Sequence, residues 1–433
     1  MMTQPFSMPP AMPPNVYSLD APPATPTPPL DGSRRASVAI VGGGIVGLTT
    51  ALHLAEAGGD VVVIDQGEPG WGASGNNGGQ LNPGLKFDPD TIERVWGPDL
   101  GPRMVRFAYE TTDRTFALID RLGIACEARQ SGTLRVARSA ISTGGVATTA
   151  RQCIDRGMPV SFLDREETAG ATGTSAYHGA MLDRRGGHLN PLAYVRGLAA
   201  AAIAAGAAVH GRTPALALNR RSGGWSIETP TGTIEAQKLL IATNGFTGDL
   251  WPGLRRTVVP VFSAIAASEP LDAERLRGIL PDRPAVYESG RITVYYRIDG
   301  RGRLLMGGRG PMRPIATPAP LAYLTDYAEA LWPQLAGLRW THGWNSRLAM
   351  TKDHWPHLHE PAPDVLAYLG CNGRGVALGT AIAEQLARRL IDGQAARLDL
   401  PVVEPKAIRF HALWPLGVWS IVQHGRILDR LGL

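Results

Sequence analysis

The spacing of apolar residues near the N-terminus predicts a strand, a helix and a second strand in succession. Residues 38–41 form a short apolar run with β-branched members, which is typical of a buried strand. Leu48, Leu52 and Ala55 then recur at helical spacing, and residues 61–64 form a second buried-type run. Together these elements predict a βαβ unit, and therefore an α/β fold with a parallel sheet.

Further elements follow from the same patterns. Helices are predicted over residues 102–121, 145–156, 192–205, 318–332 and 376–391. Strands are predicted over residues 131–137, 207–210, 215–219, 225–229, 238–243 and 365–369. From residue 257 onward the pattern is β-rich, with runs at 257–267, 285–288, 292–298 and 303–307. This region predicts a second, largely antiparallel layer.

The two ends of the chain differ from its middle. Residues 1–32 are rich in proline and predict a disordered tail, whose later part, from Tyr17, could lie along the folded surface. Residues 393–433 predict a segment that wraps back onto the body and ends in an apolar stretch containing Trp414 and Trp419. Packing of that stretch onto the body is favoured over docking to a membrane.

The composition is that of an ordinary folded protein. Of the 433 residues, 44% are hydrophobic and 19% are charged, so the chain can build two domains with real cores. The net charge of +5 is not gathered into a dense Lys/Arg block of the kind that binds nucleic acid. Three cysteines without metal-ligand spacing, no secretion signal and no apolar membrane span predict a reduced, cytoplasmic protein.

The turn between the first strand and its helix predicts a dinucleotide site. Gly42, Gly44 and Gly47 fit the GxGxxG spacing, which permits a tight turn, close approach to a pyrophosphate and packing of helix on sheet. The amide groups at the start of that helix favour the phosphates. Asp65 follows the second strand, where a carboxylate can accept hydrogen bonds from ribose hydroxyls and disfavours NADP. The motif alone leaves FAD and NAD open.

Longer strings narrow this choice through resemblance. Four stretches together resemble the amine-oxidising FAD family that contains D-amino-acid oxidases, sarcosine oxidase and glycine oxidase. They are the βαβ unit, the GASGNNGGQ loop at 72–80, the run LIATNG at 240–245, and GCNGRGVALGTAIAEQLA at 370–387. The resemblance covers residues 30–392. Within the family the chain is most similar to the gamma-glutamylputrescine oxidase-like branch, on the strings at 71–80, 243–261, 295–310 and 343–359.

The resemblance implies a role toward FAD for each matching residue. Gly42, Gly44 and Gly47 correspond to the pyrophosphate turn, and Asp65 to the ribose acceptor. The other implied cofactor residues are Ser74 and Asn77 beside the flavin and diphosphate, Thr243 near the adenine, and Gly373, Arg374 and Gly375 at the pyrimidine edge of the flavin. Some relatives attach the flavin to a cysteine in a stretch that here spans residues 345–353 and holds none. Non-covalent FAD is therefore expected.

The resemblance also implies a division into domains. A Rossmann-like FAD-binding domain would be discontinuous, over residues 33–90, 189–255 and 341–392. A substrate-binding domain of α+β type, built on an antiparallel sheet, would come from residues 91–188 and 256–340.

Two departures from the family pattern bear on the site. The branch often has an arginine where this chain has Asn76, so one charge near the cofactor is missing. Glycine-oxidase-like relatives carry an arginine that pairs with the substrate carboxylate, and the matching position here is Leu348. Arg347 is adjacent, but on a strand it would point to the opposite face. A short α-amino acid is therefore disfavoured, and an amine whose carboxylate lies far from the reacting carbon is favoured.

The implied reaction is dehydrogenation of a C–N bond, with a hydride equivalent passing to the flavin. Because the flavin carries this step, no catalytic side chain is assigned. The candidates for substrate contact are Gln80, Tyr295, Arg297, Trp344, His354 and Arg374. Tyr295 and Arg297 share one face of a strand and Tyr296 takes the other, and either face could be core. Arg297 could meet a distant carboxylate.

Several alternatives stay open. Reduced flavin could pass its electrons to oxygen, with Lys86 or Lys352 assisting, or to another acceptor, as in an amine or amino-acid dehydrogenase of the same family. A non-enzymatic FAD-binding structural or regulatory protein is the third possibility. His354, His357 and His359 invite a metal interpretation, but no nearby residue completes a ligand set, so no metal is expected. The expected partners are a small amine and an electron acceptor, and the oligomeric state is not determined.

Overall fold

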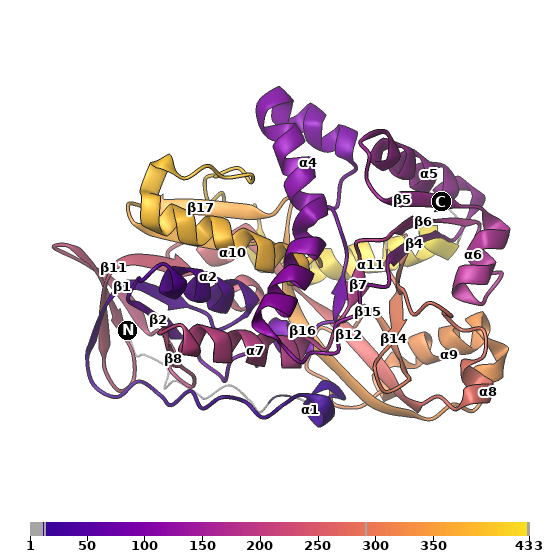
Figure 1. The fold of residues 1–433 in the computed structure, drawn as a ribbon, viewed down its shortest axis with the longest axis horizontal. Helices are drawn as coiled ribbons and strands as arrows, with labels where there is room; N and C mark the ends of the chain where they lie inside the picture. Colours follow the sequence, from indigo (N-terminus) through magenta and orange to yellow (C-terminus); the bar gives the residue numbers. More distant parts are fainter. Residues whose placement is uncertain (1–11, 13, 291, 431–433) are drawn as a thin grey trace.

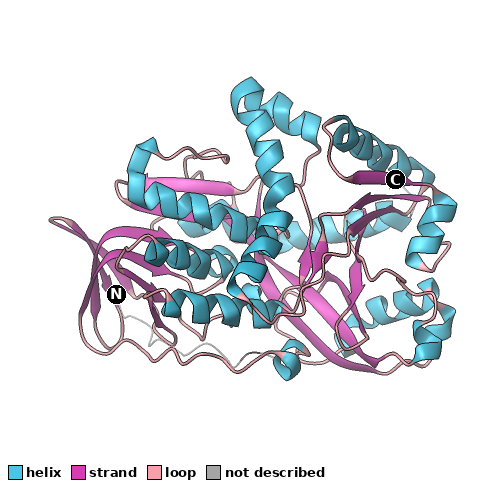
Figure 2. Ribbon diagram, viewed as in Figure 1, coloured by secondary structure: helices cyan, strands magenta, loops and turns pink. Residues whose placement is uncertain are grey.

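The computed structural model describes residues 12, 14–290 and 292–430. These residues form two units, each built on an eight-stranded sheet with helices against it (Figures 1 and 2). The predicted α/β class is confirmed.

The first unit contains the predicted βαβ. Its sheet has the order β17 (His357–Ala362), β18 (Val365–Leu369), β11 (Thr233–Ile241), β1 (Arg34–Val41), β2 (Val61–Ile64) and β8 (Ala208–His210). β10 (Gly224–Glu228) and β9 (Ala217–Arg221) extend from one side of β11. The strands from β18 to β8 run parallel. Parallel strands are buried on both faces, which explains why β2 is buried at all four positions.

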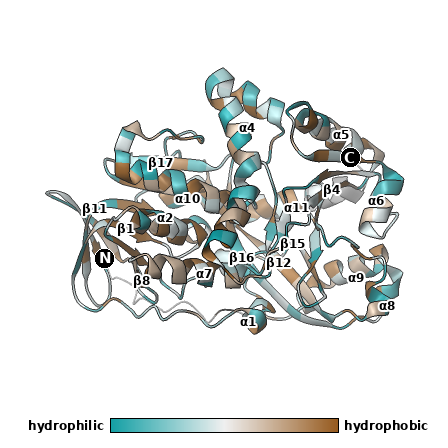
Figure 3. Cartoon of the chain, viewed as in Figure 1, coloured by the Kyte–Doolittle hydropathy of each residue, from teal (hydrophilic) through white to brown (hydrophobic). Residues whose placement is uncertain are grey.

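Three helices carry most of the apolar packing of this sheet. They are α2 (Ile45–Glu56), α7 (Pro191–Ala204) and α10 (Gly375–Asp392). Figure 3 shows the hydrophobic colouring of α2 and β1, and their buried residues include Ile40, Leu48 and Leu52. Pro191 at the first turn of α7 and the Asn190 side chain, which accepts hydrogen bonds from the Leu192 and Ala193 amides, mark where that helix begins.

The second unit is built on the predicted antiparallel layer. Its sheet has the order β16 (Trp340–Thr351), β12 (Val258–Pro270), β15 (Arg303–Arg309), β14 (Tyr295–Ile298), β13 (Ala285–Ser289), β4 (Thr133–Ala137), β6 (Gly179–Asp183) and β5 (Val160–Leu163). Only the β13–β4 pair is parallel within this sheet. The helices of this unit are α5 (Ala140–Asp155), α6 (Arg165–Thr172), α8 (Ala273–Leu276) and α9 (Ala322–Leu331).

A long helix stands between the units. At the start of α4 (Pro89–Leu122) the Thr91 amide donates a hydrogen bond to the Asp88 side chain. The helix ends at Gly123, which has the left-handed conformation. The helical backbone is interrupted at Gly97, so the predicted helix over 102–121 is the straight part after a kink. α4 contacts both α10 and α5 (Figure 1), and it therefore ties the two units together.

The N-terminal segment is not a disordered tail over its described length. Residues 14–32 lie against the body, with the short helix α1 (Tyr17–Asp20) in their path. Tyr17 is 2% exposed and meets the Trp344 ring edge to face at 5.2 Å, and Asp20 pairs with Arg301 at 3.1 Å. The part from Tyr17 onward therefore lies along the folded surface, as the sequence allowed, and Asn15 and Val16, which were assigned to the disordered tail, are buried as well, because proline content does not exclude packing of individual side chains. Residues 1–11 and 13 lie outside the described part.

One predicted domain boundary also differs. Residues 341–351 were assigned to the FAD-binding domain, but β16 pairs with β12 from Trp340 to Thr351 in the second sheet. The first unit resumes only at β17. The continuous pairing of β16 with β12 places β16 in the second sheet. The two strands are separated by about eighty residues of chain, so local sequence patterns do not predict that they pair.

After α10 the chain returns to the body and then forms α11 (Trp414–Arg430). The Val403 amide donates to the Leu358 carbonyl at 2.8 Å, which fixes the return path along β17. Among the residues described, none of the helices combines the length and the apolar character that crossing a bilayer requires.

Candidate active site

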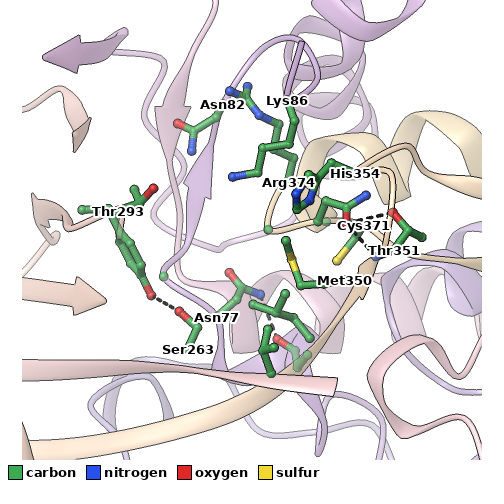
Figure 4. Close-up of a pocket in the computed structure, with 18 of the residues that line it drawn as sticks. Asn77, Asn82, Lys86, Ser263, Thr293, Met350, Thr351, His354, Cys371 and Arg374 are labelled. Atoms are coloured by element: carbon green, nitrogen blue, oxygen red, sulfur yellow. Dashed lines mark hydrogen bonds between the residues drawn. The ribbon is translucent and has the colours of Figure 1, made fainter. Parts of the chain in front are cut away.

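A cavity of about 780 Å³ lies where the two units meet. The first unit contributes the start of α2, the loop around α3 (Ala73–Asn76) and the turn before α10. The second unit contributes side chains of β12, β13, β15 and β16. Figure 4 shows Ser263 of β12 and Met350 of β16 facing Asn77 and Cys371 of the first unit across this space. Pockets between two units are common places for cofactors and substrates.

Two helices point their N-termini into the same cavity. Gly44, Ile45 and Val46 at the start of α2 line it, and so do Gly375 and Val376 at the start of α10. The positive end of the helix dipole attracts negative charge at both places. The two helices pack closely at Gly379, where an added Cβ would lie 3.1 Å from Val46. A cofactor with anionic groups at two separated points fits this arrangement.

The predicted glycine turn leaves no space for side chains. Gly42 has a φ of 118°, and a Cβ built on it would lie 2.7 Å from the Ala242 carbonyl oxygen. At Gly47 the added Cβ would lie 1.9 Å from the Gly42 carbonyl oxygen. These contacts are with backbone, which cannot move aside. The turn therefore fits the close backbone approach that a dinucleotide requires.

Asp65 holds the turn from behind. One carboxylate oxygen accepts the Gly43 amide at 2.7 Å and the other accepts the Gly67 amide at 2.8 Å. Burial raises the pKa of Asp65 to about 6, against the lowering effect of those two amides. Asp65 lies outside the residues that line the cavity. Its contact with ribose hydroxyls stays a prediction.

The glycine-rich loop at 72–80 is shaped by its own polar side chains. Ser74 lines the cavity and its hydroxyl accepts the Ile45 amide at 3.0 Å. Asn77 also lines the cavity, donates to the Ser74 carbonyl at 2.9 Å and accepts the Gly79 amide at 2.8 Å. Asn76, which stands where relatives often have arginine, is buried and donates to the Trp71 and Gly72 carbonyls.

Asn244, the residue after Thr243, connects the end of β11 to the turn between β18 and α10. Thr243 lies outside the cavity lining, and its hydroxyl pairs with that of Thr247 at 2.7 Å. Asn244 lines the cavity, accepts the Gly370 amide at 3.1 Å and donates to the Cys371 sulfur at 3.3 Å. Its φ of 40° is one that asparagine tolerates better than most residues. Sequence reasoning singled out Thr243 and missed this bridging role of its neighbour.

Four of the six predicted substrate residues line the cavity: Gln80, Tyr295, His354 and Arg374. The Tyr295 hydroxyl lies 2.9 Å from that of Ser263. Gln80 donates to the Val286 carbonyl at 2.9 Å, so one end of its amide is already held. Arg374 donates to the Pro83 carbonyl and to the Tyr287 hydroxyl, which fixes the turn before α10 against β13.

The other two predicted substrate residues lie outside the cavity. Arg297 is 2% exposed and donates to the Gly78 carbonyl at 2.8 Å and to the Leu189 carbonyl at 3.0 Å. Trp344 is fully buried and its Nε1 donates to the Asn76 carbonyl at 3.1 Å. Both side chains support the loop at 76–79 from beneath. Arg297 shares a strand face with Tyr295 as expected, but the loop covers it.

Comparisons with known proteins agree with this geometry. The FAD dependent oxidoreductase (DAO) family matches residues 37–389. The chain belongs to this family. It is 35% identical over 373 residues to the probable oxidoreductase OrdL of Rhizobium meliloti (strain 1021), covering 86% of each chain. It is 29% identical over 376 residues to the gamma-glutamylputrescine oxidoreductase of Escherichia coli (strain K12), covering 86% of this chain and 87% of that protein.

Solved structures show the same fold. The crystal structure of glycine oxidase from Geobacillus kaustophilus superposes with a TM-score of 0.72 at 22% identity, covering 85% of this chain and 97% of that one. The L-proline dehydrogenase of P.horikoshii gives a TM-score of 0.70 at 19% identity, covering 86% and 97%. The cofactor of this DAO-family chain is therefore FAD. The two helix N-termini, the glycine turn and the loop at 72–80 are the parts that would hold it.

The DAO-family cavity of this chain carries an excess of positive charge. Lys86, Arg135, Arg309, Lys352 and Arg374 line it, and Glu288 is the only carboxylate among the described lining residues. Glu288 accepts hydrogen bonds from the Tyr177 and Tyr327 hydroxyls. Because basic side chains outnumber acidic ones in this lining, the cavity favours a further anionic group in addition to those that would bind at the helix N-termini.

The neighbouring positive charges affect the pKa of Lys86. Lys86 lies beside Arg374 in the cavity lining (Figure 4), where solvent reaches it, and the surrounding protein partly desolvates its amine. This desolvation, and then the charges of Arg374, Arg309 and Arg135, lower the pKa of Lys86 to about 8. Burial likewise lowers the pKa of Arg309. The sequence alone singled out neither Arg135 nor Arg309. They come together because β4 and β15, which carry them, belong to the same sheet.

The wall formed by β16 presents Leu348 to the cavity. Arg347 points away and lies over the Phe246 ring at 4.5 Å, as strand alternation predicts. Cys371 lines the cavity near α10, and covalent attachment of the flavin is not expected. Among the described residues no group of three or more His, Cys, Asp or Glu side chains could hold a metal ion.

Proposed function

We propose that this chain oxidises a C–N bond of an aliphatic amine that carries a carboxylate far from the reacting carbon. FAD, when bound, supplies the electron acceptor for this oxidation. The residues of the chain position the amine, exclude water and bind the far end of the substrate. A gamma-glutamylputrescine-like amine meets these requirements, and the similarity to a gamma-glutamylputrescine oxidoreductase supports it.

The observation that carries this proposal is the distribution of charge around the cavity. β16 presents Leu348 where a short α-amino acid would need an arginine. The available cations stand instead on β4, on β15, on the loop after β3 (Gln80–Leu81), directly after the end of β16 and before α10. A substrate whose carboxylate is separated from its amine by a chain can reach such a cation while its C–N bond lies elsewhere.

The rest of the wall suits an aliphatic chain. Tyr287 and Tyr295 are directly paired across β13 and β14, so they lie on the same face of the sheet. Arg135 pairs with Tyr287 on the next strand. An aliphatic segment passing over the two rings would end at the Arg135 guanidinium. Oxygen is the proposed acceptor of the electrons, with another acceptor as the alternative.

Anaerobic mixing with a panel of amines tests the proposal. The purified protein is mixed with gamma-glutamylputrescine, putrescine, sarcosine, glycine and D-proline, and bleaching of the flavin absorbance is followed. Bleaching is expected with gamma-glutamylputrescine, more weakly with putrescine, which lacks the carboxylate, and least with the short amino acids. Peroxide formation on admitting air identifies oxygen as the acceptor. Bleaching by short α-amino acids alone would contradict the proposed substrate.

A further inference from the structure

The C-terminal helix α11 has apolar residues on both of its sides. Val418 and Val422 are half-buried and line the cavity. Leu416 and Trp419 of α11, and Leu413 directly before it, recur every three residues and are between 58% and 67% exposed. Phe410, just before the helix, is 77% exposed. The side of α11 that faces the cavity also carries Ile421, which is 70% exposed, and the other side exposes Leu416 and Trp419 to solvent.

Basic residues accompany the exposed apolar side chains. Lys406 and Arg409 are exposed and directly precede Phe410. The Ile408 amide donates to the Arg256 carbonyl at 2.8 Å, so the exposed residues Arg255 and Arg256 belong to the same region. Arg255 pairs with Asp249 at 3.0 Å, and Glu404 is the other nearby carboxylate. Positive charge therefore prevails around the start of α11.

We propose that α11 lies in the surface of a membrane that contains anionic lipids. Tryptophan, phenylalanine and leucine next to basic side chains are the combination by which interfacial helices bind such surfaces. A helix in this position inserts its apolar side among the acyl chains, while the basic groups meet the lipid phosphates. No helix crosses the membrane in this arrangement, in keeping with the described helices.

The charge distribution favours a lipid surface over a second copy of the chain. Parallel pairing of two α11 helices, about a two-fold axis along the helices, would bring the residues Lys406 and Arg409 of both copies toward each other, and antiparallel pairing would place them at opposite ends of the interface. A lipid surface supplies the opposite charge. The helix also lies beyond residues 37–389, the part that matches the family. Because Val418 and Val422 line the cavity, docking would bring the cavity close to the membrane.

Vesicle binding of the full-length protein loaded with FAD tests this inference. The protein is sedimented with vesicles of phosphatidylcholine alone and with vesicles that also contain phosphatidylglycerol. Binding is expected to the anionic vesicles and to weaken as salt is raised. Replacing both Leu416→Ser and Trp419→Ser is expected to reduce that binding at least roughly tenfold. Lys406→Gln with Arg409→Gln is expected to reduce binding to anionic vesicles by about fivefold or more.

The matched control is Ile141→Ser. Ile141 is 69% exposed on α5, and its replacement is expected to leave binding unchanged. Flavin absorbance and the melting temperature show that each variant is folded. Equal binding of the wild type and the Leu416→Ser/Trp419→Ser variant, or no binding to either vesicle, would overturn the proposal. So would a dimer, seen by light scattering without vesicles, that the same double variant dissociates.

Discussion

At the scale of single residues, the site depends on which side chain of an alternating pair faces inward. Leu348 faces the cavity and Arg347 packs outward on Phe246. A shift of β16 by one residue against β12 would exchange the two and place an arginine in the wall. The pairing of Val261 with Leu348 fixes the present register. The chemical character of the wall is thus set by strand register as much as by residue type.

Gly47→Ala is expected to abolish stable FAD binding. The new Cβ would lie 1.9 Å from the Gly42 carbonyl oxygen, and moving either backbone deforms the turn, at a cost of about 1–3 kcal/mol or more. The flavin absorbance per mole of purified protein measures the effect. Gly170→Ala is the control, since an added Cβ on α6 meets nothing within 4 Å. Full flavin content in the Gly47→Ala protein would show that the turn has more room than the structure allows.

Lys86 is expected to make substrate preference depend on pH. Its pKa of about 8 means that the side chain is cationic below this pH and neutral above it. The ratio of kcat/KM for gamma-glutamylputrescine to that for putrescine should therefore fall, roughly three- to tenfold, as pH rises through 8. Each substrate's own amine ionisation is measured by titration, and the ratio is corrected for it.

Two variants test whether the pH dependence comes from Lys86 or from another group. Lys86→Met should give a low ratio with no step near pH 8. Lys352→Met should keep the step, because it removes a different lysine of the same cavity and leaves Lys86 in place. A step that survives in Lys86→Met would assign the titration to another group.

The sequence predicted the residues that act through local geometry. The glycine turn at 42–47 and the polar loop at 72–80 were identified from short motifs with local contacts, such as Gly47 against Gly42 and the Gly79 amide on Asn77, and their contacts with FAD stay predictions. Arg297 and Trp344 were misplaced because the loop at 76–79 covers them from a distant part of the chain. Arg135 and Arg309 escaped notice because nothing local distinguishes them from surface arginines.

At the scale of elements, the short helix α1 fixes the N-terminal segment to the second unit. Tyr17 packs on Trp344, and Arg297 lies 5.8 Å above the Tyr17 ring. The Asn15 side chain donates to Asn76 at 2.9 Å. Through these contacts α1 reaches the underside of the loop at 76–79 and supports one wall of the cavity.

Tyr17→Ala is expected to destabilise the fold by about 3 kcal/mol, because it removes a fully enclosed aromatic ring and leaves a cavity beside Trp344. Urea denaturation followed by tryptophan fluorescence measures the change. Leu19→Ala on the same helix is the control, since Leu19 is 66% exposed, and its effect should stay within roughly 0.5 kcal/mol. Equal, small effects of both substitutions would mean that α1 is not anchored.

Most helices and strands were predicted close to their observed places, whereas their assembly was not. The helix at 192–205 and the strand at 365–369 correspond to α7 and β18, because apolar periodicity reports burial directly. The membership of β16 in the second sheet and the kink of α4 at Gly97 depend on tertiary contacts. Local sequence patterns predict neither the sheet to which β16 belongs nor the kink of α4.

At the scale of the whole molecule, the cavity has walls from both units, so its ligand joins them. Removal of FAD is therefore expected to lower the melting temperature of the entire protein. At free FAD a hundredfold above its dissociation constant, binding contributes about 2.7 kcal/mol, which corresponds to several degrees for a chain of this size. Thermal scans of the protein stripped of FAD and then reloaded measure the shift. A stripped protein that melts at the same temperature would show that FAD does not link the units.

The position of β18 has a consequence for synthesis of the chain. β18 pairs with residues 239–241 of β11, yet it is translated more than a hundred residues later. At typical elongation rates the ribosome needs on the order of ten seconds to cover that distance. During this time β11 presents an apolar edge with unsatisfied backbone groups, which is a template for aggregation. Cells that make this protein therefore have to shield that edge until residue 369 has emerged.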